Sequence, residues 1–219
     1  MTPVVLVVAK APIAGLAKTR LIPDSSAPAA ARIAAAALLD TLDVVLATPD
    51  VTPVVALTGN LAEAESAGEL ARLLDRCTVI DQRGHGLDER LAAAHEDVAE
   101  LFPGRPVLQI GMDTPQVRPE LLTGSLARLD DHDAVLGPAA DGGWWALGLR
   151  DARDGAALRG VSMSQADTAF LTRTALSARG LAVGTLPTLS DVDTVADVLR
   201  VAGRLPGSRF ALAAAAVAR

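Results

Sequence analysis

The chain has 219 residues, a length typical of one domain with a sizeable core, and we expect a single domain over 1–219. It carries 26 acidic and 20 basic residues, and this net charge of −6 argues against nucleic acid or an anionic membrane as the main partner. Half of the residues are hydrophobic but 2% are aromatic, so alanine, valine and leucine must build the core.

Cysteine usage and hydropathy favour a cytoplasmic protein. Cys77 is the single cysteine, so the chain cannot form an internal disulfide, which fits a reducing compartment. The apolar run VVLVVA near the N-terminus is too short for the hydrophobic region of a signal peptide and has no basic segment before it. The later run ALAAAAVA cannot span a bilayer. We therefore expect a soluble, cytoplasmic chain without a membrane span.

Expected strands and helices alternate along the chain. Apolar, often β-branched runs predict strands at 3–9, 52–58, 77–81, 105–110, 133–137, 144–149 and 181–187. Helical spacing and capping residues predict helices at 28–47, 61–74, 87–101, 119–130, from the pair Ser164 and Asp167 to Gly180, and at 195–203. The alanine-rich segment 207–219 is expected as a docked helix or a frayed tail.

This alternation predicts a three-layer α/β fold with a mainly parallel sheet. Two strands in succession between 133 and 160 break the pattern and predict a small antiparallel excursion. In open α/β sheets, ligands bind outside the carboxyl ends of the strands. The loops that follow the strands are therefore the places to search for chemistry.

A basic loop follows the first expected strand. The stretch AKAPIAGLAKTRL (9–21) contains both lysines of the chain and carries Lys10, Gly15, Lys18 and Arg20. Ammonium and guanidinium groups on a flexible turn suit a polyphosphate. A P-loop would need glycine where Pro12 and Ala17 stand, which disfavours a Walker-type NTPase. The alternative is a solvated surface loop.

Carboxylates follow two other strands. Asp113 ends the fourth expected strand, and Asp191 and Asp193 follow the last one in the motif SDVDT. Mg²⁺ and Mn²⁺ prefer such oxygen ligands and commonly bridge to substrate phosphates. The alternative is that these carboxylates cap the turns and helices that follow them.

Two further loops offer substrate contacts. The turn Asp141-Gly142-Gly143 lets backbone approach a ligand, and Trp144 and Trp145 after it should face opposite sides of a strand, one in the core and one near a ligand. In QRGHGLD, the residues that could lie along a base or sugar are Gln82, Gly84 and Gly86, and the alternative is a plain loop without a ligand. The three histidines lack the spacing of metal ligands, which disfavours zinc.

Four stretches in chain order, AKAPIAGLAKTRL, GMDTPQ, GPAADGGWWALGL and SDVDTVADVL, resemble a known family. It comprises GT-A-type glycosyltransferase-like proteins, also called radical-SAM/selenodomain-associated transferases. That family is similar to the nucleotidyltransferases that make molybdopterin dinucleotide and phospholactate guanylyl products. The resemblance covers residue 3 to about residue 203 and implies a Rossmann-like, nucleotide-diphospho-sugar transferase fold that uses Mg²⁺ or Mn²⁺.

The resemblance also implies roles for individual residues. Lys18 and Arg20 match the phosphate-binding loop, Asp113 and Asp193 match the two metal ligands, and residues 141–143 match an Asp-Gly-Gly turn near the acceptor. The chain departs from the family at Trp144-Trp145-Ala146-Leu147, Met163 and Asp88, where an aromatic followed by Leu-Leu, a Trp and a Gly are usual. The acceptor and the base therefore stay open.

We expect a metal-dependent transferase that moves a nucleotidyl group from an NTP to a small anionic acceptor. The expected catalytic residues are Lys18, Arg20 and Asp113, with Asp113 and Asp193 as metal ligands. The expected substrate-binding residues are Lys10, Gly15, Gln82, Gly86, Asp141, Gly142, Gly143 and Trp144. The alternatives are a glycosyltransferase that uses a nucleotide sugar and a non-catalytic nucleotide-binding module. The expected partners are a nucleotide and a small molecule, without nucleic acid, and a homodimer is left open.

Overall fold

The computed structural model describes residues 1–216, which contain a seven-stranded sheet. The strands are β1 (Val4–Lys10), β2 (Thr52–Thr58), β3 (Thr78–Asp81), β4 (Val107–Gly111), β5 (Ala134–Pro138), β6 (Trp144–Leu149) and β7 (Val183–Thr185). Their order is β3-β2-β1-β4-β6-β5-β7, and β6 runs antiparallel to both of its neighbours while the other pairs are parallel. The predicted parallel sheet with an antiparallel excursion is confirmed.

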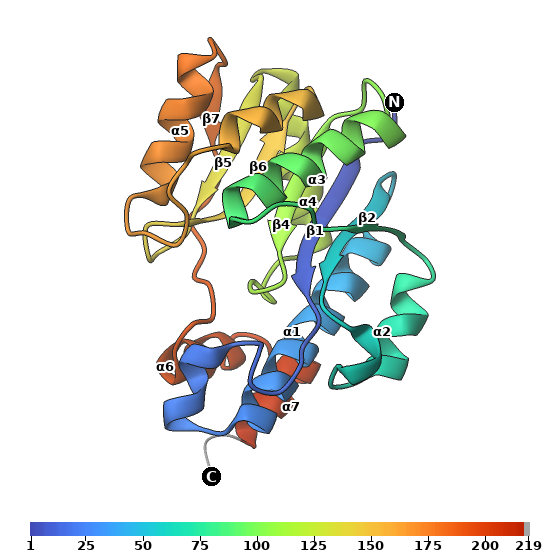
Figure 1. Cartoon of the computed structure of the whole chain (residues 1–219), viewed down its shortest axis with the longest axis vertical. Coiled ribbons are helices and arrows are strands. Elements are labelled where there is room, and N and C mark those ends of the chain that lie inside the picture. Colours follow the sequence, from blue (N-terminus) through green and yellow to red (C-terminus); the bar gives the residue numbers. More distant parts are fainter. Residues whose placement is uncertain (217–219) are drawn as a thin grey trace.

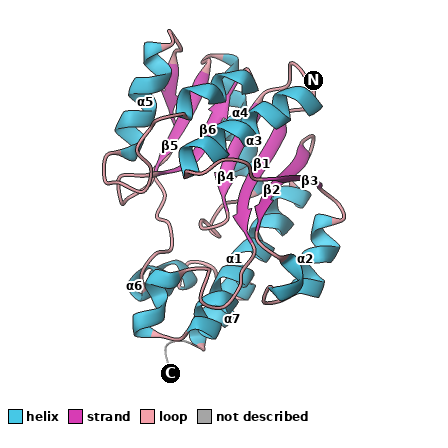
Figure 2. Cartoon of the chain, in the orientation of Figure 1, coloured by secondary structure: helices cyan, strands magenta, loops and turns pink. Residues whose placement is uncertain are grey.

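Helices cover both faces of this sheet (Figures 1 and 2). The α-helices are α1 (Ala27–Ala47), α2 (Ala67–Leu74), α3 (Leu87–Leu101), α4 (Pro119–Ala127), α5 (Thr168–Ala178), α6 (Val195–Ala202) and α7 (Arg209–Ala215). Shorter 3-10 helices are η1 (Thr19–Asp24), η2 (Leu61–Glu63), η3 (Arg128–Asp130) and η4 (Ala152–Leu158). Within residues 1–216, no helix combines the length and apolar character needed to cross a membrane.

The core follows the alternation of side chains along the strands. In β1, Val5 belongs to a buried cluster that includes Leu38 of α1, whereas Leu6 belongs to a second cluster that includes Leu91 of α3. The first cluster also takes residues from α2 and α4, and the second takes residues from η4 and α5. The sheet is therefore the middle layer of three.

A third buried cluster joins the two chain ends. Phe210 of α7 is fully buried and packs with Ile33 of α1 and Val198 of α6. Figure 1 shows α6, α7 and η1 gathered beyond the carboxyl ends of the parallel strands. Within the described residues, the alanine-rich tail is thus a docked helix over Arg209–Ala215. Residues 217–219 lie outside the part of the chain that the structure describes.

Two helix starts agree with their capping residues. Ser26 caps α1 by accepting a hydrogen bond from the backbone N–H of Ala29 at 3.3 Å. Thr194 and Asp197 form a capping box at the start of α6, the helix expected over 195–203, and each side chain accepts from the backbone N–H of the other residue. Both caps are local patterns, so their residues alone were sufficient to predict them.

Three expectations need correction. The helix expected over 61–74 divides into η2 and α2, because Ala64 and Ser66 leave the helical region of backbone space. The strand expected over 181–187 pairs only over Val183–Thr185. Ser164 does not cap α5: its backbone is left-handed (φ 58°), and α5 begins at Thr168. Thr168 instead accepts from the N–H of Gln165 and donates to Ser162 O, which closes that loop.

Candidate active site

A pocket of about 390 Å³ opens at the carboxyl edge of the sheet, over β1, β4 and β6. The residues named in the sequence analysis that line it are Arg20, Asp113, Asp141, Gly143, Trp144, Trp145, Met163, Ser164, Asp191 and Asp193. They come from segments far apart in the chain, which the parallel topology brings to one edge. Lys10, Gly15, Lys18, Gln82, Gly86 and Gly142 are not among the described lining residues.

Lys18 lies directly behind the pocket wall and joins two of its carboxylates. Its Nζ is 2.9 Å from Asp113 Oδ2 and 3.1 Å from Asp193 Oδ1, and its side chain is 7% exposed. It also donates to Val192 O. Burial by itself lowers the pKa of Lys18, but Asp113 and then Asp193 outweigh it, so the pKa is raised above its usual value. The ammonium group is therefore a fixed positive charge between these two carboxylates.

Arg20 adds a second cation at the mouth of the pocket. Its Nη1 donates to Asp193 Oδ2 at 2.6 Å, while its side chain stays 65% exposed. Lys18 and Arg20 thus hold the two oxygens of the Asp193 carboxylate from different sides. Because most of the Arg20 side chain is exposed to solvent, it can turn towards an incoming anion with little loss of packing.

Three aspartates form a compact acidic group next to these cations. Asp141, Asp191 and Asp193 each offer a carboxylate oxygen, and these oxygens lie within 4.8 Å of one another. Burial, then the negative charges of Asp141 and Asp193, raise the pKa of Asp191 to about 6. A set of carboxylate oxygens this close together fits a hard divalent cation such as Mg²⁺ or Mn²⁺.

The metal ligands expected from the sequence occupy different positions in this arrangement. Asp193 belongs to the acidic group, whereas the contact of Asp113 is with Lys18. Asp191 belongs to the same acidic group, although the expected ligands were Asp113 and Asp193. The signal for Asp191 was its place in the motif SDVDT, two residues before Asp193.

The segment that carries Asp191 and Asp193 is anchored on both sides. The Asp197 side chain accepts from Asp193 N at 3.4 Å and from Thr194 N at 2.9 Å, which fixes the backbone just before α6. On the other side, Gln116 Nε2 donates to Ser190 O and links this segment to the loop after β4. The loop after β4 is therefore tied to the segment of Asp191 and Asp193 by a hydrogen bond from a side chain to the backbone.

The Asp141-Gly142-Gly143 turn is fitted against the start of α5. Gly142 has a φ of 91°, and a Cβ at this position would lie 1.9 Å from Ala166 O. Its own carbonyl accepts from Ala169 N at 2.9 Å, and Asp141 Oδ1 accepts from Gly143 N at 2.8 Å. The turn thus positions the Asp141 carboxylate at the pocket, and glycine is needed for the close approach.

The adjacent tryptophans belong to opposite faces, as expected. Trp145 is 3% exposed, packs in the first buried cluster and donates from Nε1 to Pro187 O at 2.8 Å. Trp144 packs against the second cluster, lines the pocket and donates to Thr172 Oγ1 at 3.1 Å. Both tryptophans line the pocket, and Trp144 is the less buried of the two.

Some expected substrate contacts are engaged in other interactions. Gln82 Nε2 donates to Ala9 O and Ala56 O, both at 2.8 Å, and so ties together the ends of β1 and β2. Gly86 directly precedes α3, where a Cβ would lie 2.3 Å from Asp88 Oδ1. Lys10 is exposed at the end of β1. The substrate roles of these residues stay predictions.

Three polar residues of the pocket region were not found from the sequence. Gln109 and Thr114 line the pocket and are each 2% exposed, and His95 lies behind Gln109. A lone glutamine inside an apolar strand was the available signal for Gln109. Thr114 directly follows Asp113, and its Oγ1 makes no hydrogen bond with any residue of the described chain.

The chain is similar to known proteins in sequence and in fold. A bacterial family described as "Uncharacterized protein conserved in bacteria (DUF2064)" matches residues 41–165. The "Phosphoenolpyruvate guanylyltransferase" of Geodermatophilus obscurus is 38% identical over 132 residues, or 58% of each chain. The matched part of this chain thus spans less than two thirds of the length of the curated relatives.

Solved structures share the whole fold. The "putative nucleotide-diphospho-sugar transferase" of Desulfovibrio desulfuricans G20 superposes with a TM-score of 0.83 at 26% identity, covering 96% of this chain and 93% of that chain. Rv0371c of Mycobacterium tuberculosis H37Rv, solved as a manganese complex, has a TM-score of 0.54 at 20% identity and covers 91% and 98%. The predicted nucleotide-diphospho-sugar transferase fold is therefore confirmed.

Proposed function

This chain belongs to the DUF2064 family, and on that premise we propose that it is a metal-dependent nucleotidyltransferase. The observation that carries the proposal is the convergence of Lys18 and Arg20 on Asp193, beside the three-aspartate group at one edge of the sheet. Two cations next to a hard-cation site suit a triphosphate with its metal. The name of the Geodermatophilus relative makes GTP the first donor to test.

Asp193 and Asp191 would hold the cation, with Asp141 or Asp113 as a further ligand. When bound, a divalent cation there supplies charge stabilisation for the phosphates. Arg20 would contact the phosphate oxygens at two points, and Lys18 would stabilise the phosphate charge from behind Asp113 and Asp193, where its ammonium group is held. An oxygen of the anionic acceptor attacks the α-phosphorus, the bond to the bridging oxygen breaks, and pyrophosphate leaves with the electron pair. No general base is required, because the acceptor arrives ionised.

Glycosyl transfer from a nucleotide sugar is the second candidate. The name of the Desulfovibrio structure favours it, and that structure matches nearly the whole chain. Both reactions would use the same metal and phosphate site, but a nucleoside diphosphate rather than pyrophosphate leaves in glycosyl transfer. Two cations at the site favour the more highly charged triphosphate. The proposed partners are a nucleotide and a small acceptor, and the cytoplasm is the proposed location.

Product analysis separates the two reactions. The protein is incubated with Mn²⁺, each of the four NTPs and a pool of small phosphorylated and carboxylic acids that includes phosphoenolpyruvate, and released pyrophosphate is measured. We expect pyrophosphate from one NTP, and at least a ~100-fold lower rate with Asp193→Asn because a metal ligand is lost. Release of nucleoside diphosphate from GDP- or UDP-sugars, without pyrophosphate from any NTP, would contradict the proposal.

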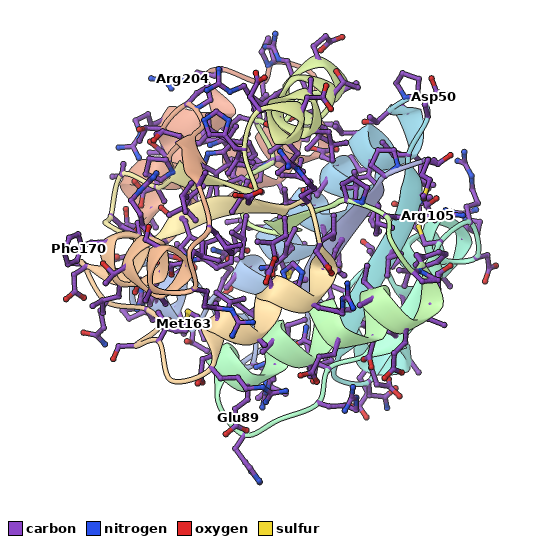
Figure 3. All side chains as sticks on the ribbon, turned by 90° about the horizontal axis from the view of Figure 1, so that it is seen from above. Asp50, Glu89, Arg105, Met163, Phe170 and Arg204 are labelled. Carbon is purple, nitrogen blue, oxygen red and sulfur yellow. The ribbon has the colours of Figure 1, made fainter. Side chains whose placement is uncertain are left out.

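Asp50→Asn provides the matched control for this carboxylate-to-amide change. Asp50 is exposed and lies at the edge of the molecule, well away from Met163 of the pocket (Figure 3). Its positive φ of 55° is one that asparagine also adopts, so the backbone should not change. We expect this variant to release pyrophosphate at the wild-type rate.

A further inference from the structure

Gln109 is a buried polar residue in an otherwise apolar strand. It is 2% exposed, and its neighbours Leu108 and Ile110 are fully buried. Its side chain shares a face of β4 with Val107 and Gly111. Gly111 has no side chain to cover the pocket floor beyond Gln109, and a Cβ there would meet a single atom, Asp113 N, at 3.9 Å. Gln109 thus remains part of the pocket lining.

His95 of α3 fixes the orientation of this carboxamide. Its Nε2 lies 2.8 Å from Gln109 Oε1, and the imidazole is fully buried. Its other nitrogen, Nδ1, has no hydrogen-bond partner among the described residues. Gly155 leaves room for the His95 side chain, because a Cβ at Gly155 would lie 2.3 Å from His95 Cβ. Burying two such polar side chains lowers the stability of the fold unless all of their hydrogen bonds are made. We therefore expect the pair to have a role beyond packing.

The contact with His95 leaves the amino group of the carboxamide free for a ligand. Since Gln109 Oε1 accepts the His95 proton, Gln109 Nε2 carries two N–H donors. Across residues 1–216, Gln109 Nε2 makes no hydrogen bond with another residue, and the side chain lines the pocket. The floor of the pocket therefore offers an oriented, uncharged hydrogen-bond donor.

The walls around this donor are apolar. We call this part of the pocket the apolar half; it consists of Val8, Leu87, Leu91, Gln109, Trp144 and Met163. Figure 3 places Met163 between α3 and α5. Arg20 is the positively charged side chain among the described lining residues, and it pairs with Asp193 of the three-aspartate group. An anionic group would therefore meet no positive charge in the apolar half, whereas an uncharged group would be accommodated.

We propose that Gln109, held by His95, recognises an uncharged oxygen in the apolar body of the acceptor. The anionic end of the acceptor then lies at the group of Asp141, Asp191 and Asp193. That this ligand is the acceptor rests on the proposed function. The ligand is assigned as the acceptor because Gln109 shares the pocket with Asp141, Gly143 and Trp144, which belong to the turn expected near the acceptor, while Gln82 and Gly86, expected along the base, are outside the described lining. The acceptor class is thus a monophosphate or similar anion with an aliphatic body that carries a carbonyl or ether oxygen.

Binding of simple phosphate esters tests this inference without any nucleotide. The affinities of hexyl phosphate and of its 3-, 4- and 5-oxo derivatives are measured by calorimetry in the presence of Mn²⁺. We expect at least one oxo ester to bind about tenfold more tightly than hexyl phosphate, as one satisfied hydrogen bond predicts. In protein labelled with ¹⁵N-glutamine, that ester should shift the side-chain amide signal of Gln109 and leave that of Gln165 in place.

The variant His95→Leu/Gln109→Leu removes both partners, so no buried group is left unpaired and the fold is retained. It should bind hexyl phosphate as the wild type does and lose the preference for the oxo ester. His95→Leu alone should reduce that preference without changing the affinity for hexyl phosphate, a pattern that a purely structural role would not produce.

The inference is overturned if no oxo ester binds more tightly than hexyl phosphate, or if the double variant keeps the preference. It is also overturned if phosphoenolpyruvate binds more tightly than every hexyl ester, because the apolar half would then be unused. Failure of the proposed function would be seen separately, as the absence of pyrophosphate release from any NTP.

Discussion

Lys18 has its charged group inside the protein because three acceptors surround it. Its backbone is left-handed (φ 48°) at the start of η1, and the ammonium reaches Asp113, Asp193 and Val192 O. Three donors on a compact head match three acceptors that converge on one point, whereas a planar guanidinium would not. This geometry explains why a chain that otherwise uses arginine has a lysine at position 18.

Lys18→Met, which keeps the length of the side chain but not its charge, should weaken GTP binding in Mn²⁺ at least ~10-fold. Guanosine should bind as it does to the wild type, because it carries no phosphate charge for Lys18 to stabilise. Lys10→Met is the comparison: Lys10 is exposed, and within the described residues it forms no ion pair with Asp113 or Asp193, so we expect a smaller loss. Equal weakening of GTP and guanosine, measured by calorimetry, would contradict the phosphate role of Lys18.

His95 should make stability sensitive to acid. Burial lowers its pKa from 6.5 to about 4, and Gln109 offsets this only in part. The unfolded chain therefore binds a proton below its pKa of 6.5 while the folded protein resists it, so stability falls as the pH drops from 6.5 towards 4. We expect the free energy of unfolding to decrease by about 2 kcal/mol between about pH 7.5 and about pH 5 from this group.

Urea denaturation at both pH values, on the wild type and on His95→Leu/Gln109→Leu, isolates that contribution. The double variant lacks the titrating ring, and all other titrating groups are shared, so the decrease should be about 2 kcal/mol smaller in it. An identical decrease in both proteins would show that His95 titrates normally in the folded state.

At the scale of elements, the contact between the β5–β6 turn and α5 positions Asp141. Gly142→Ala would add a Cβ 1.9 Å from Ala166 O at a φ of 91°, so the turn must move. Gly160→Ala has a similar φ of 79° but no atom within 4 Å of the new Cβ, and it measures the backbone strain alone. We expect about 1 kcal/mol of destabilisation for Gly160→Ala and clearly more for Gly142→Ala in urea denaturation.

The same pair of variants also reports on the acidic group. Gly142→Ala should weaken Mn²⁺ binding as well, since Asp141 is carried by the displaced turn, while Gly160→Ala should leave Mn²⁺ binding unchanged. Equal stability and equal Mn²⁺ affinity of the two variants would mean that the close approach to Ala166 has no role in positioning Asp141.

Elements that depend on local patterns could be predicted from the sequence, and those that depend on distant contacts could not. The cap at Thr194 and the apolar runs of β1 and β2 carry their own signals. Ser164 had the spacing of a capping residue, but Thr168 uses its hydroxyl to hold the loop to Ser162 instead. Helix η4 lacks a periodic apolar pattern and forms where it packs against α3.

At the scale of the whole molecule, the site is assembled by topology. Lys18 and Asp193 are separated by 175 positions in sequence, yet they meet because β1 and β7 both point to the same edge of the sheet. Strand ends and motif types were sufficient to place Asp113, Asp141 and Asp193 at one pocket. The pairing of His95 with Gln109 could not be found that way, since no local pattern relates a helix residue to a strand residue on the face it covers.

The most direct test of the central claim is a calorimetric comparison of GTP and GDP-mannose binding to the wild-type protein, each with and without Mn²⁺. If Lys18, Arg20 and the aspartate group form a metal–triphosphate site, GTP should bind at least ~10-fold more tightly than GDP-mannose, and Mn²⁺ should be required for that difference. Tighter binding of GDP-mannose in Mn²⁺ would contradict nucleotidyl transfer and support glycosyl transfer.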